Sequence, residues 1–209
     1  ILHAALTGIQ PDGPAPLVAG MPVDELDIWT LPVVVHVFHL GSPEGNDENI
    51  SDAQIISAID ALNDDFRKIA GTNGDGDGVD VRIEFELAQR DPNGAPSSGI
   101  VRVDATGISG FAENGIASSA GYPGVDEVTV KSFSSWDVED YINVFVVPEI
   151  NGNDGGGGVQ GFAFIGPTGD VRDGITVLYN AFGTVGTLKP GREKNRTLTH
   201  EMGHYLTLL

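Results

Sequence analysis

Hydrophobic and polar residues alternate along the chain with two periods, and these predict its strands and helices. A nearly continuous apolar run over 31–38 predicts a strand that is buried on both faces. Residues 81–87 alternate between apolar and polar, which is typical of a half-buried strand. Shorter apolar or alternating runs predict five further strands, over 100–103, 127–131, 141–147, 159–165 and 175–179.

Two segments have the period of a helix. Ser51 and Gln54 form a capping box, and the apolar positions that follow predict a long helix with Ile69 as its last core position. Apolar residues at helical spacing predict a second helix over 196–206, with Thr197 or Thr199 as a candidate cap. The segment 104–126 is rich in Gly, Ser and Ala and predicts a long surface loop.

The order of these elements predicts the fold class. One strand, one helix, several strands and a last helix, with no internal repeat, favour an α+β or mixed α/β domain, a twisted sheet backed by two long helices. Residues 1–30 are rich in Pro and lack periodicity, so we expect an extended arm or the remnant of a pro-segment. The folded domain is then expected over 31–209.

The second helix carries the most specific chemical pattern of the chain, His-Glu-Met-Gly-His. His200 and His204 lie four residues apart, so they share one helix face and can bind one Zn²⁺ through their imidazole nitrogens. Glu201 follows the first His and can hold a water molecule as a general base. Because a catalytic zinc has three protein ligands, the third ligand is not supplied by this motif.

Composition excludes several classes of function. The formal net charge of −19 repels phosphate, so neither nucleic acid nor an anionic lipid surface is expected as a partner. The absence of Cys excludes disulfides, thiolate ligands and a Cys nucleophile. No apolar run approaches the length of a membrane span. The chain starts at Ile1, without Met or a basic segment, and we expect a processed product whose signal peptide has been removed.

One acidic turn suggests a second metal. Asn73, Asp75 and Asp77 occupy alternate positions, a glycine stands sixth, and Glu84 stands twelfth, which follows the pattern of an EF-type Ca²⁺ loop. The departures are Asn at the first position and a predicted strand after the loop. The alternative is a solvated acidic turn between helix and strand.

Several segments, in this order, resemble the pappalysin-like (cytophagalysin) metalloproteases of the metzincin clan. They cover most of the chain from Leu31 and are LPVVVHVFH, ISDAQIISAIDALNDDFRK, RIEFELAQRDPNGAPSSGIVRV, YINVFVVPEI, GFAFIG with DGITVLYNAFGT, and GREKNRTLTHEMGHYL. The resemblance implies the amino-terminal subdomain of a metzincin, with a five-stranded twisted sheet, a backing helix and an active-site helix. It also implies a secreted zinc endopeptidase that cleaves proteins or peptides, with Glu201 as the general base.

In the family, an edge strand above the cleft binds the extended substrate through backbone hydrogen bonds. The resemblance makes 159–165 the best candidate for this edge. The residues expected to contact substrate are Gly161, Phe162, Ala163 and Phe164.

The chain departs from the clan pattern after the second His. Thr207 stands where the clan has a glycine, and the third His would fall just beyond Leu209. A β-branched residue resists the positive φ that glycine adopts, so we expect a less abrupt exit or a continuing helix. We expect the third ligand and the carboxy-terminal subdomain on the remaining polypeptide or on a separate fragment. The alternative interpretation is a non-catalytic binding or structural module with a protease-like fold, stabilised by calcium.

Overall fold

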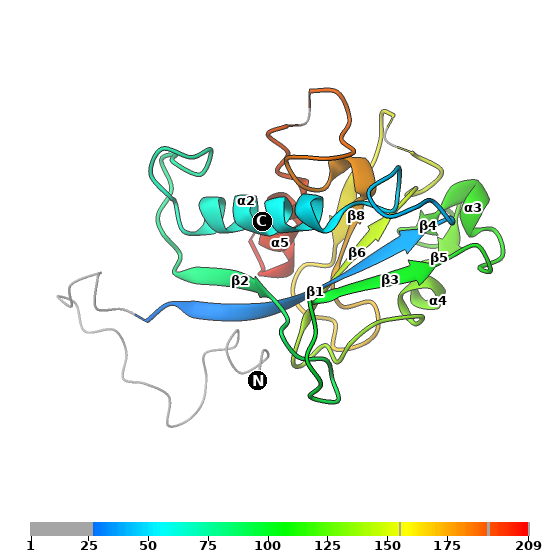
Figure 1. Cartoon of the computed structure of the whole chain (residues 1–209), viewed down its shortest axis with the longest axis horizontal. Helices are drawn as coiled ribbons and strands as arrows, with labels where there is room; N and C mark the ends of the chain where they lie inside the picture. The colour runs from blue at the N-terminus through cyan, green and yellow to red at the C-terminus, as the bar shows by residue number, and fades with distance from the viewer. Residues whose placement is uncertain (1–26, 155, 192, 209) are drawn as a thin grey trace.

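A computed structural model describes residues 27–154, 156–191 and 193–208, in which helices pack against a large twisted sheet (Figure 1) and two short strands form a second, separate sheet. The strands are β1 (Trp29–His39), β2 (Ile83–Leu87), β3 (Ile100–Asp104), β4 (Ile116–Ala117), β5 (Val125–Asp126), β6 (Ile142–Val147), β7 (Gly161–Ala163) and β8 (Ile175–Leu178). The α-helices are α2 (Asp52–Phe66), α3 (Phe111–Asn114), α4 (Glu127–Lys131) and α5 (Thr197–Tyr205), and a 3₁₀ turn, η2, spans Tyr179–Ala181.

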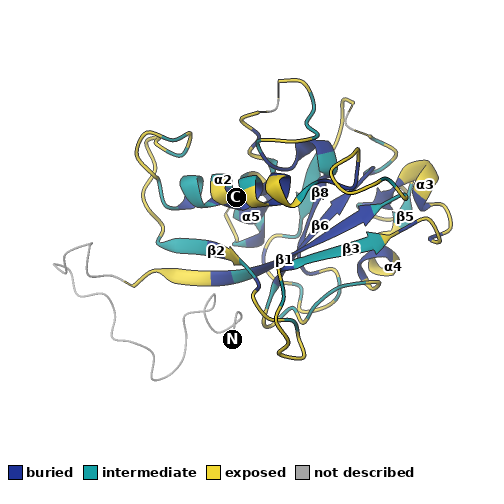
Figure 2. Ribbon diagram, viewed as in Figure 1, coloured by how far each residue is buried: buried dark blue, intermediate teal, exposed yellow. Residues whose placement is uncertain are grey.

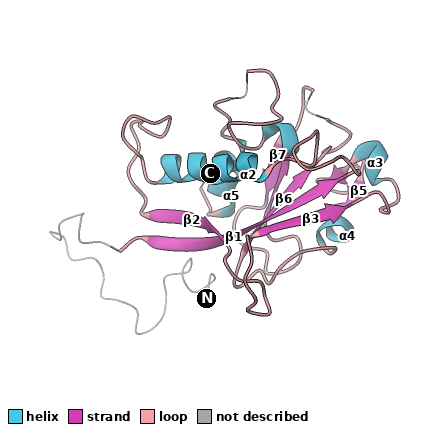
Figure 3. Cartoon of the chain, in the orientation of Figure 1, coloured by secondary structure: helices cyan, strands magenta, loops and turns pink. Residues whose placement is uncertain are grey.

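The main sheet has the order β2-β1-β6-β8-β7, with β3 also paired to β1. Residues 29–33 of β1 pair with β2 and residues 35–39 pair with β3, so these two strands share one edge of β1. The six-stranded sheet is therefore five strands wide, in agreement with the expected five-stranded sheet. All pairs are parallel except β7, which forms the other edge and runs antiparallel to β8 (Figure 3). The predicted mixed α/β fold class is confirmed.

The core is centred on β1 and β6. Residues 33–38 of β1 and all of β6 are buried, and they form the dark centre of the sheet in Figure 2. Burial on both faces explains why these strands are continuous apolar runs instead of alternating ones.

Helix α2 is the backing helix, and its start was predicted correctly. The Ser51 hydroxyl oxygen accepts a hydrogen bond from the Gln54 backbone N–H at 3.2 Å, which caps the helix. The helix ends at Phe66, whose ring packs edge-on against Phe85 of β2 at 5.0 Å between centroids. The predicted extension to Ile69 is wrong, because the chain turns at Lys68 with a φ of 50°.

The predicted strand over 127–131 is wrong, because this segment is helix α4. The Asp126 carboxylate accepts hydrogen bonds from the backbone N–H groups of Val128 and Thr129, at 3.0 and 3.3 Å, and so caps the helix. The preceding segment, predicted as a long loop, contains the short elements α3, β4 and β5.

The proposed amino-terminal arm lies largely outside the described residues. Strand β1 begins at Trp29, inside the range expected for the arm, and pairs there with β2. Within the part of the chain that the structure describes, no helix has the length and apolar character needed to cross a membrane.

Candidate active site

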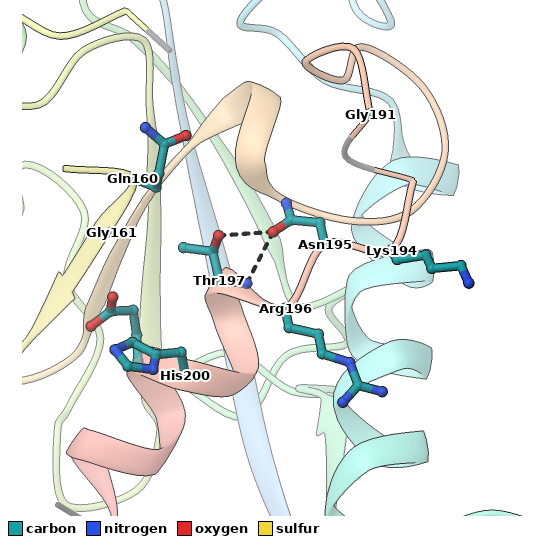
Figure 4. Close-up of a pocket in the computed structure, with 9 residues that line it drawn as sticks. Gln160, Gly161, Gly191, Lys194, Asn195, Arg196, Thr197 and His200 are labelled. Carbon is teal, nitrogen blue, oxygen red and sulfur yellow. Dashed lines mark hydrogen bonds between the residues drawn. The ribbon is translucent and has the colours of Figure 1, made fainter. Parts of the chain in front are cut away.

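Helix α5 is positioned by side chains around its first turn. The predicted helix begins one residue too early, and its N-cap residue is Arg196, not a threonine, with no capping bond from its own side chain. Asn195 Oδ1 accepts from the backbone N–H and from the hydroxyl of Thr197, at 3.0 and 2.8 Å (Figure 4). The buried Asp65 side chain of α2 accepts from the Thr199 hydroxyl at 2.7 Å and pairs with Arg196 at 2.8 Å. These contacts fix α5 against α2.

The two histidines of the motif converge. Their Nε2 atoms lie 3.1 Å apart, and the ring planes cross at 80°. Two nitrogen ligands of one tetrahedral zinc, each at 2.0–2.1 Å from it, lie roughly 3.3 Å apart, so this geometry fits two ligands of a single ion. The predicted pairing of His200 and His204 on one helix face is therefore present in the structure.

A backbone carbonyl orients the second histidine. His204 Nδ1 lies 3.2 Å from the carbonyl oxygen of Leu208, which can only accept, so Nδ1 carries the proton. His204 Nε2 is then the unprotonated nitrogen of the ring, and it lies 3.1 Å from His200 Nε2. This is the arrangement in which a second partner fixes the tautomer of a metal-binding imidazole.

The turn that supplies this carbonyl corrects the expectation for Thr207. Helix α5 ends at Tyr205, and Thr207 adopts a φ of 71° in spite of its branched side chain. The Leu208 N–H donates to Gly203 O at 2.8 Å and the Thr207 N–H donates to His204 O at 2.9 Å. This pair of bonds is a Schellman turn with Thr in the position that glycine usually occupies. The helix therefore neither continues nor leaves gradually.

Glu201 lies on the side of α5 that faces β7 and is buried, at 7% exposure. Burial raises the pKa of its carboxyl group, and the nearby imidazoles of His200 and His204 and the Ala163 backbone partly oppose that shift. A carboxylate whose pKa is raised towards neutrality binds a proton more readily than an exposed one, as a general base requires.

The edge strand presents its two faces to different partners. Gly161 lies against Glu201 of α5, whereas the ring of Phe162 lies 5.3 Å from the Lys131 ammonium on the opposite face of the sheet. Phe164 follows the end of β7, and the Arg172 guanidinium lies 5.8 Å from its ring. The backbone of β7 is the part of this segment that a substrate could pair with.

A pocket of about 430 Å³ lies between β7 and the first half of α5 (Figure 4). It brings together two of the predicted site residues, His200 and Glu201, with Gly161 of the predicted substrate strand. Its lining is completed by Gln160, Gly191, Lys194, Asn195, Arg196 and Thr197.

Comparisons with known proteins agree with this geometry. Residues 125–209 match the family model Peptidase_M43, described as pregnancy-associated plasma protein-A. A solved structure of mirolysin in complex with compound 9 is 32% identical, with a TM-score of 0.65 over 86% of this chain.

The chain is similar to the pappalysin-like metalloproteases.

Two further solved structures show the same similarity. Mature mirolysin of Tannerella forsythia, in complex with a cleaved peptide, is 32% identical with a TM-score of 0.66, and the match covers 86% of this chain and 63% of that one. A promirolysin mutant of the same organism is 33% identical with a TM-score of 0.63, covering 85% and 55%. The first mirolysin match also covers 63% of that protein, so this pappalysin-like chain spans less than two thirds of these relatives. No curated protein matches it significantly.

The residues of the calcium hypothesis are not gathered around one point in this pappalysin-like chain. Glu84 forms an ion pair with Arg67, and the Asp75 carboxylate accepts from the Gly71 backbone N–H at 3.0 Å. Asn73 lines a separate groove beside α2. Over the described ranges, no group of three His, Cys, Asp or Glu residues is arranged to hold a metal, so calcium binding by Asn73, Asp75, Asp77 and Glu84 stays a prediction.

Sequence reasoning missed a buried lysine beneath the edge strand. Lys131 is fully buried, pairs with Glu127 at 3.1 Å, and donates from Nζ to the backbone oxygen of Arg172 at 2.8 Å. Its ammonium also lies 5.3 Å from the rings of both Phe145 and Phe162, within cation–π range. Burial lowers the pKa of Lys131, and the Glu127 carboxylate opposes that shift. The four-residue spacing of the pair, behind an Asp cap, was the signal available in the sequence.

Proposed function

We propose that this chain carries the catalytic base and two metal ligands of a secreted zinc-dependent endopeptidase that acts on proteins or peptides. The observation that carries the proposal is the convergence of the Nε2 atoms of His200 and His204, at 3.1 Å, beside the buried Glu201 and beneath the edge of the sheet. The similarity to this family supports a metalloprotease, and zinc is the metal that a pair of imidazoles at this spacing suits.

His200 and His204 fit two of the three protein ligands of a catalytic zinc. Both imidazoles are directed at one point, and the Leu208 carbonyl holds His204 in the tautomer that a ligand needs. A catalytic zinc site needs a third protein ligand in addition to these two imidazoles. When bound, zinc would supply the positive charge that makes a water molecule nucleophilic near neutral pH and polarises the scissile carbonyl.

Glu201 would move the proton. Its buried carboxylate accepts the proton that the attacking water loses and later gives it to the leaving amine. Burial favours this role, because it raises the affinity of the carboxylate for a proton while leaving the group beside the open pocket.

Strand β7 would hold the substrate. It is the last strand of the sheet order within the described residues, so its outer edge is available to pair with an extended peptide. Backbone pairing selects for extended conformation rather than for sequence, and Gly161, Ala163 and Phe164 would supply the contacts nearest the reacting bond. The Phe162 side chain would not contact the substrate directly, because it packs towards Lys131 on the opposite face of the sheet. Phe162 would support the strand instead.

The test is cleavage of an unstructured protein by the full-length enzyme, with zinc measured on the same sample. Glu201→Gln is expected to lower kcat/KM by about 10²- to 10⁴-fold while zinc binding and fold are kept. Unchanged cleavage by that variant would exclude Glu201 as the base. A full-length wild-type protein that neither binds zinc nor cleaves protein would favour the non-catalytic module.

A further inference from the structure

The first residue of the edge strand has little room for a side chain. A Cβ placed on Gly161 would lie 3.0 Å from each of three atoms, namely Glu201 Cγ, Thr197 Cγ2 and the backbone oxygen of Thr176. Two of these atoms belong to α5 and one belongs to β8. At Gly161 the substrate edge and the helix of the candidate active site are thus in close contact.

The contacts differ in how easily they could give way. Thr176 O belongs to the paired strand β8, and Phe162 faces Thr176 in the β7–β8 register. Thr197 is held by its two hydrogen bonds to Asn195 Oδ1. Glu201 has rotatable bonds on both sides of its Cγ, so its side chain is the part that would move first.

A further contact of Glu201 is on the same strand. The Ala163 backbone interacts with its carboxyl group, two residues along β7 from Gly161. Gly161 and Ala163 face the same side of the strand, because side-chain direction alternates. Strand β7 therefore contacts Glu201 at two places, at Cγ through Gly161 and at the carboxyl group through the Ala163 backbone.

We infer that Gly161 is a positioning residue, whose missing Cβ lets the edge strand lie close enough to α5 to hold Glu201 in line with the reacting bond. The inference rests on the proposed function. It assigns to this glycine a role separate from substrate contact, since the tight approach is to the base and not to the open edge of the strand.

A substitution at this position tests geometry and not backbone strain. Gly161 does not have a positive φ, so alanine can adopt its backbone conformation. Gly157, in the glycine-rich segment before β7, also lacks a positive φ and has nothing within 4 Å of an added Cβ. Gly157→Ala is therefore a matched control for the loss of a glycine.

The experiment compares Gly161→Ala and Gly157→Ala in the full-length protein. For Gly161→Ala we expect kcat to fall about tenfold or more with KM changed less than about twofold, because misplacing a reacting group affects the chemical step. Zinc content and affinity should match the wild type, and the crystal structure should show the Glu201 side chain displaced. Gly157→Ala should keep wild-type kcat.

A second substitution distinguishes a positioning role of Gly161 from a general loss of stability in Gly161→Ala. Thr197→Ser removes Cγ2 and keeps the hydroxyl that donates to Asn195. In the Gly161→Ala background it should restore part of kcat, because the added methyl can then move away from Glu201. Wild-type kcat in Gly161→Ala, or a double variant that regains thermal stability without regaining kcat, would overturn the inference. An inactive wild-type protein without zinc would instead overturn the proposed function.

Discussion

Histidine and glutamate occur on both faces of the sheet, and their surroundings give them different roles. On the face of α5, His200 and His204 direct their nitrogens at one point beside a pocket. On the face of α4, His36 and Glu127 are sealed among strands and aromatic rings. We therefore propose a chemical role for these residue types where they lie beside a pocket, and a structural role where they are buried in the sheet.

The buried face is held by specific partners. His36 Nε2 donates to Asn143 Oδ1 at 2.9 Å, and its ring stacks on Phe145 with centroids 4.9 Å apart. The Lys131 ammonium lies 5.3 Å from the same Phe145 ring and 5.3 Å from the ring of Phe162 in β7. The buried face packs under β7, and the proposed active site lies on the opposite face of the same strand. We therefore expect substitutions on the buried face to lower the stability of the protein more than its activity.

The largest effect is expected from breaking the buried ion pair. Lys131→Met leaves the Glu127 carboxylate buried without its cation, and we expect the free energy of unfolding to fall by about 3–5 kcal/mol. Urea unfolding of the full-length protein measures this. The double variant Lys131→Met/Glu127→Leu should recover most of the loss, because no buried charge remains. A single variant as stable as the wild type would show that the pair does not hold this face together.

A smaller loss of folding stability is expected at acidic pH, because of the buried His36. Burial lowers the pKa of His36 from 6.5 to about 4, so between these values the unfolded chain binds a proton that the folded chain excludes. Stability is then lost as the pH falls from about 6.5 to about 4, by up to about 3 kcal/mol, and this loss is absent above pH 6.5.

The measurement is the free energy of unfolding at several pH values for the wild type and for His36→Gln. The variant should lose less stability than the wild type across this interval. His39→Gln, at the end of the same strand, is the control and should keep the wild-type slope. Equal slopes in all three proteins would contradict the account of the buried face.

The smallest effect is expected at the turn after α5. Thr207 has a φ of 71°, and replacing it with glycine removes the strain of a branched side chain there, so Thr207→Gly should stabilise the protein by about 1 kcal/mol. Asn tolerates this conformation better than Ala, so thermal unfolding should rank the variants Gly, then Asn, then Ala. A destabilised glycine variant would mean that the Thr207 side chain makes a favourable contact outweighing its strain.

The local part of the site could be predicted from sequence, because residues four apart share a helix face wherever the helix packs. His200 and His204 have this spacing, and their Nε2 atoms lie 3.1 Å apart. The contact of Gly161 with Glu201 could not be predicted in this way, since it depends on how closely an edge strand approaches a helix distant in sequence.

The elements of the fold also differ in how well the sequence predicted them. The long buried strand β1 and the capped helix α2 carry strong patterns and were predicted well. Helix α4 was mistaken for a strand because Val128 and Val130 alternate with polar residues, and the Asp126 cap outweighs that alternation. The burial of Lys131 was invisible because lysine is normally exposed, and its partners come from distant segments.

The most direct test of the account is anomalous diffraction at the zinc edge from crystals of the full-length protein. The account predicts one strong peak within bonding distance, about 2.0–2.1 Å, of Nε2 of both His200 and His204, with the Glu201 carboxylate beside it and not bound to it. A zinc peak elsewhere, or histidines that point away from each other with no peak between them, would contradict the central claim.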